Sequence, residues 1–319
     1  MDIEKYNMLQ RNYTKKNKKL NLVSLLIISI IELISIIILI MKKSSIELII
    51  TTIIIELIVL LLVLVIIKIT LFSNDKKEIY ELYLKIKEEL VLKVLKKYFT
   101  NITYNQSKGL TESFIRKEGL MSTGDIYSSN DSISGIYKNI KFCQSDINIE
   151  EEKEEKDDEG NVTTYYETVF RGRWLVFDFN KEFKSNLIVE SGAFPNLVYG
   201  QEYMDIEIED VEFNNSFNIY AQNEHEAFYI LTPSFIEKLK KIDKKIQSAG
   251  IRFLFNNNKL HIGINNSDDA FEFDELKEIN EQEIEANMEN DIRLIMDLID
   301  ELDLTNDLFK KKQNNMTIN

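Results

Sequence analysis

The chain of 319 residues is poor in the residue types that most often carry chemistry, with one cysteine, two histidines and ten glycines. Because Cys143 stands alone, an intramolecular disulfide framework and a zinc site built on several thiolates are excluded. His225 precedes Glu226 but lacks the second histidine of a His-Glu-x-x-His zinc helix, and the glycines form neither a dinucleotide fingerprint nor a phosphate-binding loop. We therefore expect no catalytic residues, no metal and no cofactor.

Basic charge is also scarce over most of the chain. The formal net charge is −14 at pH 7. Residues 1–72 hold 9 Lys and Arg against 5 Asp and Glu, a net charge of +4, whereas residues 73–319 hold 30 bases against 48 acids, a net charge of −18. Neutralising phosphates requires a basic surface, so this balance argues against nucleic-acid binding.

Two long apolar runs occupy the N-terminal part. Strongly apolar side chains make up 17 of the 22 residues at 20–41 and 18 of the 22 residues at 46–67. Each run is about 33 Å long as a helix, enough to cross a hydrocarbon core of roughly 30 Å. A cleaved signal peptide is excluded, because no small-residue cleavage site follows the first run and a second run begins almost at once. We predict a transmembrane helical hairpin over residues 20–72, with the lipid bilayer as its partner.

The basic residues near the hairpin predict its orientation. Five lie within residues 11–19 and outweigh Lys42 and Lys43 of the linker. The positive-inside rule then places the N-terminus and the large C-terminal body in the cytoplasm, at the inner membrane of a bacterial cell. A single unpaired cysteine agrees with a reducing compartment.

Polar residues within the two runs predict an intramembrane polar seam, made of Glu32, Glu56, Ser29, Ser35 and Thr52. At 100° per residue, both serines fall within about 60° of Glu32, and Thr52 lies one turn before Glu56. The hairpin sets the two acids at similar depth, where a protonated Glu can donate a hydrogen bond. Such a seam is compatible with helix packing, with self-association through the hairpin, and with an ion or proton path.

The remaining chain predicts an α+β fold with an antiparallel sheet and flanking helices. Apolar residues at three- and four-residue spacing from Ile79 to Tyr98 predict an amphipathic stalk that continues the second span. The expected organisation is a basic cytoplasmic N-terminal segment (1–19), the hairpin (20–72), the stalk helix (73–100), a cytoplasmic α+β domain (101–305) and a polar C-terminal tail (306–319).

Strand signals dominate the first half of the domain. One strand with a kink near Gly135 is predicted across residues 133–142, and residues 163–180, rich in aromatic and β-branched side chains, predict another with a bend at Gly172. Between them, residues 150–159 contain eight acids and two lysines. Such a run predicts a solvated hairpin loop.

The second half predicts further strands at residues 187–190, 204–209 and 216–220, a hairpin at 251–264 and a long helix at 274–302. A helix is expected to open at Thr232 and Pro233, with Ser234 and Glu237 as a capping box. Its five lysines predict either a solvated face or a surface that docks onto anionic lipid. Acids at 207, 209, 210 and 212 predict an exposed strand face, with a divalent-cation site as the alternative.

Three short motifs then carry a family resemblance. Residues 209–213 read Glu-Asp-Val-Glu-Phe, residues 217–220 read Phe-Asn-Ile-Tyr, and residues 231–235 read Leu-Thr-Pro-Ser-Phe. With the preceding hairpin and stalk, they resemble the bacterial family catalogued as domain of unknown function 3137, over roughly residues 20–305. The resemblance implies a membrane-anchored cytoplasmic domain with no assigned activity. Physically, the motifs predict Phe213, Phe217 and Phe235 as core residues and Thr232 as a helix cap.

These observations favour a membrane-tethered interaction or scaffold module that binds an unknown cytoplasmic protein. The acidic body predicts a basic partner and salt-sensitive binding. The alternatives are an oligomeric ion or proton channel, or transport component, that uses Glu32 and Glu56, and an enzyme with an unrecognised site.

Overall fold

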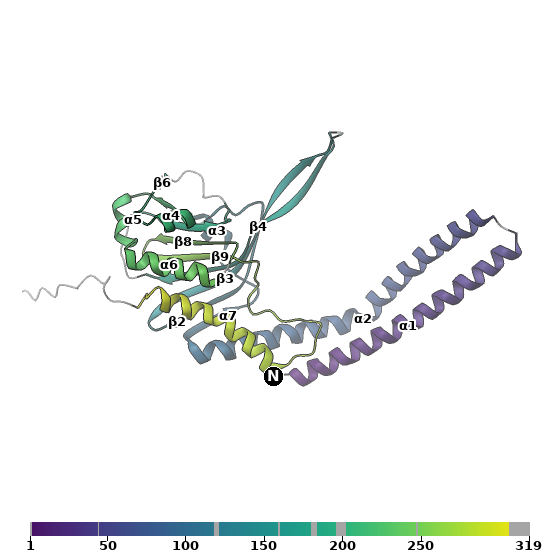
Figure 1. Ribbon diagram of the computed structural model, residues 1–319. Helices are drawn as coiled ribbons and strands as arrows, with labels where there is room; N and C mark the ends of the chain where they lie inside the picture. Colours follow the sequence, from purple (N-terminus) through teal and green to yellow (C-terminus); the bar gives the residue numbers. More distant parts are fainter. Residues whose placement is uncertain are drawn as a thin grey trace, which may run out of the picture. The chain divides into compact units, whose positions relative to one another are not determined.

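The computed structural model describes residues 2–43, 45–117, 121–158, 160–179, 184–195, 202–246 and 248–305, so the predicted tail at 306–319 lies outside the described residues. The elements follow one another as in Figure 1: α1 (Ile3–Met41), α2 (Ile46–Tyr98), β1 (Thr100–Asn105), α3 (Glu112–Lys117), β2 (Ile126–Tyr137), β3 (Ile140–Lys156), β4 (Val162–Asp178), β5 (Leu187–Gly192), β6 (Met204–Asp205), α4 (Val211–Ser216), β7 (Asn218–Ala221), α5 (Glu224–Ile230), α6 (Pro233–Ile246), β8 (Gly250–Asn256), β9 (Lys259–Asn265) and α7 (Glu281–Glu301).

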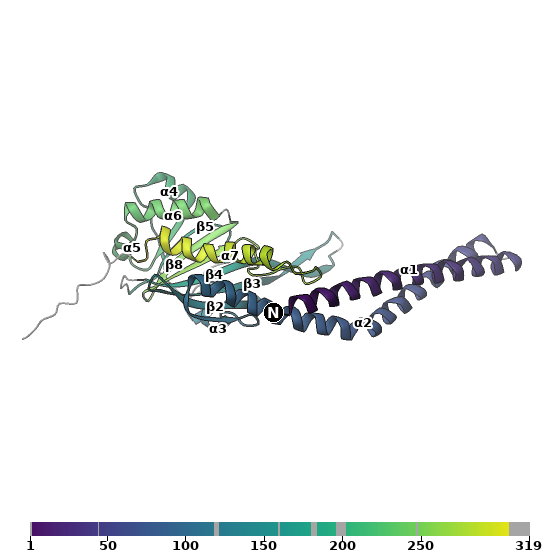
Figure 2. The same ribbon diagram turned by 90° about the horizontal axis from the view of Figure 1, so that it is seen from below.

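The first compact unit comprises the described residues up to Glu89 together with Phe273–Ile284. Its main feature is the antiparallel pair of α1 and α2, visible in both Figure 1 and Figure 2. The most apolar windows of these helices have mean hydropathies of 3.0 and 3.2, and 0% of either window is buried. By length and composition, the described part of the chain therefore has two helices able to cross a membrane.

The N-terminal part of α1 docks onto the segment that precedes α7. Tyr6 and Gln10 both donate to the carbonyl of Glu275, at 2.7 and 2.6 Å. Asn7 donates to the carbonyl of Ile279 at 3.0 Å and accepts from its N–H at 2.7 Å. Because these contacts occupy the backbone groups of the segment, the helix predicted from residue 274 begins only at Glu281, and that part of the prediction is wrong.

The second compact unit comprises Leu90–Glu272 and the described residues from Glu285 onward. Its described strands form one nine-stranded antiparallel sheet in the order β1-β2-β3-β4-β9-β8-β5-β7-β6. Helices flank this sheet, so the predicted α+β class is confirmed. Side chains alternate between the two faces along each strand.

Each face of the sheet has its own apolar layer. On one face, Trp174 and Ile147 pack in a cluster with Ile115 of α3. On the other face, aromatic rings form the layer: Phe235 of α6 lies 5.9 Å from Phe255, measured between ring centroids. Phe213, Phe217 and Phe235 are 0%, 3% and 7% exposed, which confirms their prediction as core residues. The core therefore lies on both sides of the sheet.

Three predicted elements differ from the structure in the first half. The single strand across residues 133–142 is wrong, because Lys138 and Asn139 adopt positive φ and turn the chain between β2 and β3. The acidic run is not a loop: through Lys156 it belongs to β3 and pairs with β4 as far as Val162. The predicted stalk stripe ends differently, since Tyr98 is 38% exposed and the next residue, Phe99, is buried.

In the second half, the hairpin is confirmed, with its turn at Asn257 and Asn258, whose φ values of 46° and 60° fit a type I′ turn. Helix α6 begins as predicted, and the predicted cap Thr232 is confirmed by the bond from Phe235 N to Thr232 Oγ1 at 3.4 Å. The capping box predicted for Ser234 and Glu237 is wrong, because Ser234 lies inside the helix. The strand predicted at 204–209 is wrong beyond Asp205, because Asp210 instead caps the short helix α4. Helix α5 was not predicted.

Candidate functional site

The predicted seam lies at the contact between α1 and α2. Ser35 Oγ donates to Glu56 Oε1 at 3.0 Å, and both side chains are half-buried. This bond joins the two helices within the apolar run. With Thr52 nearby, Ser35 and Glu56 line a recess of about 380 Å³ on the helical pair. The structure therefore brings together the serine and the acid that come from opposite arms of the hairpin.

The other seam residues are placed differently. Both carboxylate oxygens of Glu32 are covered and have no hydrogen-bond partner among the described residues. Thr52 donates to the carbonyl of Leu48 at 2.8 Å, within its own helix. Ser29 is exposed and donates to the carbonyl of Leu25 at 2.5 Å, so it lies outside the contact. The role of the seam stays a prediction.

We expect Ser35→Ala to lower the stability of the helical pair by about 0.5–1.5 kcal/mol, the range for hydrogen bonds between helices in a membrane. Unfolding of the full chain by SDS in mixed micelles, followed by energy transfer between labels at residues 19 and 68, measures this loss. Ser29→Ala is the matched control, because that hydroxyl bonds only to its own helix. Equal losses in the two variants would show that the bond to Glu56 contributes nothing specific.

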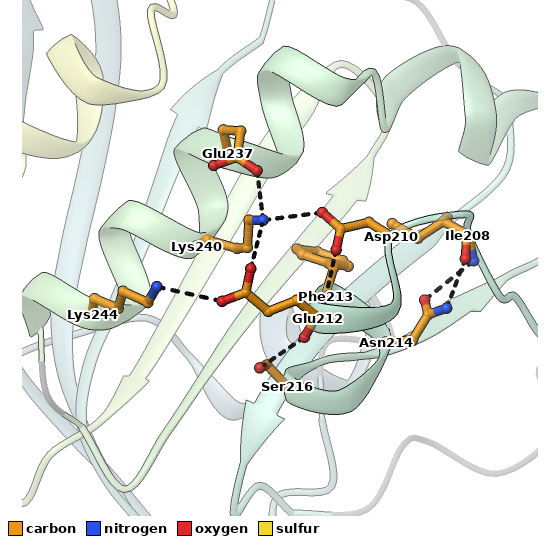
Figure 3. Close-up of polar contacts among 9 residues, drawn as sticks. All are labelled: Ile208, Asp210, Glu212, Phe213, Asn214, Ser216, Glu237, Lys240 and Lys244. Atoms are coloured by element: carbon orange, nitrogen blue, oxygen red, sulfur yellow. Dashed lines mark hydrogen bonds and ion pairs between the residues drawn. The ribbon is translucent and has the colours of Figure 1, made fainter.

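The lysines of α6 do not form a free basic surface. Figure 3 shows Lys240 between Asp210 and Glu212 of the α4 region and Glu237 of its own helix, with N···O distances of 3.0, 3.4 and 2.5 Å. Lys244 lies 3.8 Å from Glu212. The remaining three pair with acids of α7 and the residues after it: Lys238 with Asp303, Lys241 with Glu301, and Lys245 with Asp297.

The same contacts explain the first family motif as a structural element. Asp210 accepts from the N–H of Phe213 at 3.0 Å and so caps α4. That N–H, together with Lys240, holds the pKa of Asp210 below its usual value, while the bond that Lys240 donates to Glu237 raises the pKa of Lys240. The acids at 210 and 212 bind lysine, and those at 207 and 209 are exposed. The cation site considered for these four acids is therefore not assembled.

A different group of acids converges on the α7 side of the sheet. Asp131 lies at the irregularity in the pairing of β2 with β3, with φ at 47°, and is fully buried. Its carboxylate accepts from Tyr104 OH at 2.5 Å and from Asn130 Nδ2 at 2.8 Å. Burial and the neighbouring Asp131 raise the pKa of the Tyr104 hydroxyl, which keeps it a donor. One oxygen each of Asp131, Asp269 and Glu272 lie within 4.8 Å of one another.

Asp146 lies near this group, close enough for the charges of Asp131 and Asp269 to act on it. The four residues are named here the acidic cluster: Asp131, Asp146, Asp269 and Glu272. Asp146 is 3% exposed, and its backbone pairs with that of Asn130 beside Asp131. Its Oδ2 accepts from the N–H of Ala270 at 2.9 Å, which sets the carboxylate against the loop that carries Asp269. Burial, opposed in part by Arg173, raises the pKa of Asp146 to about 8.

Arg173 fixes the loop beside the cluster. This guanidinium is 2% exposed and donates to Asp291 of α7 twice, to the carboxylate at 2.5 Å and to the carbonyl at 2.9 Å. The second carboxylate oxygen of Asp291 accepts from the N–H of Phe271 at 2.9 Å. Sheet, loop and helix are therefore joined through one buried ion pair.

The residues usually considered for nucleophilic or acid–base chemistry are poorly suited to it. Burial raises the pKa of the Cys143 thiol to about 11. His261 is 1% exposed, and burial lowers its pKa to about 3. His225 lies exposed on α5. Neither the thiol nor the imidazole of His261 is charged near neutral pH.

Sequence reasoning did not identify the acidic cluster or Arg173. A signal did exist, because Gln144, Asp146 and Arg173 lie among buried apolar residues of two central strands, where charges are rare unless they are paired. Their partners at 269, 272 and 291 come from distant segments with ordinary acidic compositions. Only the folded topology brings these segments together.

Comparison with known proteins agrees with the motifs that α4 and α6 carry. A family model described as protein of unknown function (DUF3137) matches residues 168–304, a segment that starts in β4 and ends after α7. No curated protein and no solved structure matches the chain. The match includes Arg173, Asp269 and Glu272, whereas Asp131 and Asp146 precede it. Residues 168–304 therefore belong to the DUF3137 family of proteins of unknown function.

Proposed function

We propose that the chain is a membrane-anchored interaction module, whose helical hairpin holds the sheet domain at the cytoplasmic face of a bacterial inner membrane. The observation that carries this proposal is the outer part of the β3–β4 ribbon, named here the acidic arm: residues 151–156 of β3 and 162–167 of β4. In Figure 1, this ribbon projects from the sheet. The proposed partner is a protein with a basic contact segment.

The acidic arm has two open edges. Pairing of β3 with β2 ends at Glu150, and pairing of β4 with β9 ends at Gly172, so among the described strands those of the arm pair only with each other. An isolated two-stranded ribbon is only marginally stable in water. On this arm, Val162, Tyr165 and Tyr166 are 50%, 46% and 51% exposed. Aromatic side chains on an exposed ribbon are well suited to bind a partner, since they supply a large contact area.

The charge of the arm indicates the class of partner. Within the acidic arm, five acids face only two lysines, and one of these, Lys153, is already paired with Glu151 at 2.7 Å. Acidic residues also discourage edge-to-edge pairing with another acidic arm. A basic segment would meet complementary potential, and its association would weaken as salt screens the charges over about 10 Å or less.

The anchor is supported by the first unit. The contacts of Tyr6, Asn7 and Gln10 with residues 275–279 hold the N-terminus and the later segment together, as an even number of membrane crossings requires. Arg11 and Lys16 are paired with Glu278 and Asp75. Because the positive-inside rule counts basic residues and gives little weight to acids, these ion pairs leave the proposed orientation intact.

Site-specific photocrosslinking in the native cell tests the proposal. With a photoreactive amino acid at Tyr166, we expect an adduct with a protein whose crosslinked peptide is rich in Lys and Arg. The adduct should fall at least fivefold when Glu152, Glu154 and Glu155 are changed to Gln. The matched control places the probe at Phe228, which is 44% exposed on α5. No adduct at Tyr166, or the same adduct at Phe228, would overturn the role of the arm.

A further inference from the structure

We propose that the basic partner segment binds as an additional β-strand along the edge of β4 that faces away from β3, at residues 162–168. This edge is named here the open edge. The inference rests on the proposed function and specifies how the acidic arm holds its partner. Strand addition of this kind uses the backbone hydrogen bonds that an edge strand leaves unmade, and the side chains of the two strands then set the specificity.

The alternation of backbone groups along the arm places hydrogen-bonding groups on the open edge. The N–H of Glu152 points away from β4, because it donates to the carboxylate of Asp125 at 2.8 Å. Glu152 faces Tyr166 in the register of β3 with β4. In an antiparallel pair, two opposed residues either exchange both backbone bonds or exchange none, so Tyr166 also directs its N–H and C=O away from β3. The same holds for every second residue from 162 to 168.

The open edge begins where the covered part of β4 ends. Nearer the sheet, the N–H of Arg171 donates to Asn265 Oδ1 at 3.2 Å, and the carbonyl of Arg171 accepts from the N–H of Ser267 at 2.8 Å. The carbonyl of Val169 accepts from Asn265 Nδ2 at 3.4 Å. From residue 168 to residue 162, the outward backbone groups of β4 have no partner among the described residues. They form a template for another strand.

The two edges of the arm differ in composition. Charged residues discourage pairing at an edge strand, and residues 151–156 of β3 are all Glu or Lys. Residues 162–166 of β4 read Val-Thr-Thr-Tyr-Tyr, without charge or proline, and all five are exposed. Such β-branched and aromatic residues favour strand pairing. Since Asp125 also occupies the N–H of Glu152 on β3, the added strand is assigned to β4.

The charge of the arm favours a basic strand over a second copy of the chain. Each arm has a net charge of −3, so two arms side by side would repel each other. Glu167, the acid on β4 itself, faces Glu151 in the register and makes no ion pair within the described part of the chain. The nearby Lys153, on which the charge of Glu167 acts, is bound to Glu151 at 2.7 Å. Like charges directly opposite each other are destabilising, and a Lys or Arg on the added strand, about 4.8 Å from β4, would offset this repulsion.

Photocrosslinking in the native cell with the probe at Tyr166 tests strand addition when a proline is placed on the open edge. Proline lacks the N–H, so an edge strand tolerates it where that N–H points outward, but it blocks pairing with an added strand. We expect Thr164→Pro to lower the yield of the partner adduct at least tenfold, and Thr164→Ala to change it less than twofold. Thr168→Pro, at the other end of the open edge, is a second variant with the same expected loss.

The matched control lies on the opposite strand. Glu154 faces Thr164, so Glu154→Pro blocks only the edge of β3, and its yield should agree within twofold with that of Glu154→Gln. Amide hydrogen exchange at Thr163 and Tyr165, whose N–H groups point toward β3, confirms that the ribbon is intact in each variant. Glu167→Gln should lower the yield at least threefold, because it removes the acid nearest the added strand.

The outcomes separate this inference from the proposed function. An adduct that persists in Thr164→Pro and Thr168→Pro, or that falls equally in Glu154→Pro, overturns strand addition at β4 and leaves the role of the arm in place. An adduct with a second copy of the chain overturns the choice of a basic partner strand. The absence of any adduct in the chain with an unaltered arm overturns the proposed function and strand addition together.

Discussion

Replacing Arg173 with methionine is expected to lower the free energy of unfolding by about 3–5 kcal/mol. The methionine keeps much of the apolar stem but leaves Asp291 without the guanidinium that it meets at 2.5 Å. Arg173 is 2% exposed and Asp291 is 24% exposed, so water replaces the lost partner of the carboxylate only in part. Denaturant unfolding of the full chain in detergent, followed by the fluorescence of the neighbouring Trp174, measures the loss.

Arg171→Met supplies the control on the same strand. Arg171 is 51% exposed and lies 3.6 Å from Asp269, so its removal should cost less than about 1 kcal/mol. The double variant Arg173→Met with Asp291→Asn should lose less than the sum of the single changes, because both remove the same ion pair. Strict additivity would contradict the interpretation of Arg173 and Asp291 as one unit.

The second large effect is a dependence of stability on pH that arises from His261. Burial lowers the pKa of His261 in the folded chain to about 3, from 6.5 in the unfolded chain. Between these values the unfolded chain binds a proton that the folded chain does not, so stability is complete above pH 6.5 and falls as the pH drops. We expect a loss of roughly 2 kcal/mol between about pH 6.5 and pH 5.

His261→Leu should remove this loss, so the difference in unfolding free energy between the two proteins isolates the imidazole from every other titrating group. Acid-induced and denaturant-induced unfolding at half-unit pH intervals give that difference. His225→Leu is the matched control, because the exposed imidazole on α5 remains in water when the chain unfolds. A difference between the His261 variant and the unmodified chain that does not change with pH would mean that the buried ring is reached by solvent.

Local signals predicted the parts of the fold that local physics determines. The two apolar runs needed only length and hydropathy, and α6 needed only a proline at its first turn and an apolar stripe. The turn at Asn257 and Asn258 could also be predicted from local residues, because asparagine tolerates positive φ. In each case, the deciding residues lie within a few positions of one another.

The predictions were wrong where contacts with a distant segment determine the local structure. Residues 275–279 have helical spacing, yet their carbonyls and N–H groups bind Tyr6, Asn7 and Gln10 from the other end of the chain. The acidic run has loop composition, but its partner strand supplies Thr and Tyr side chains that favour extended pairing. Short helices such as α4 depend on a cap and on a buried residue, here Asp210 and Phe213.

The candidate sites differ in the same way, since one could be predicted from local sequence and the other could not. The contact of Ser35 with Glu56 could be anticipated, because the hairpin geometry places the two arms at matched depth. The acidic cluster could not, since it depends on a shift of register at Asp131 and on the loop after β9. Neither feature leaves a periodic pattern in the sequence.

The docking of the N-terminal helix also limits when the contacts of the first unit can form during synthesis of the chain. Tyr6 and Gln10 meet Glu275, a partner that lies 269 and 265 positions later in the chain. At about 5–20 residues per second, a ribosome takes roughly 10–50 s to make the intervening segment. The hairpin therefore leaves the ribosome long before its own N-terminal contacts can form, and the whole sheet is synthesised in the interval. Only chains that extend to residue 279 can make these contacts, so the first unit is completed after all strands of the sheet have been synthesised.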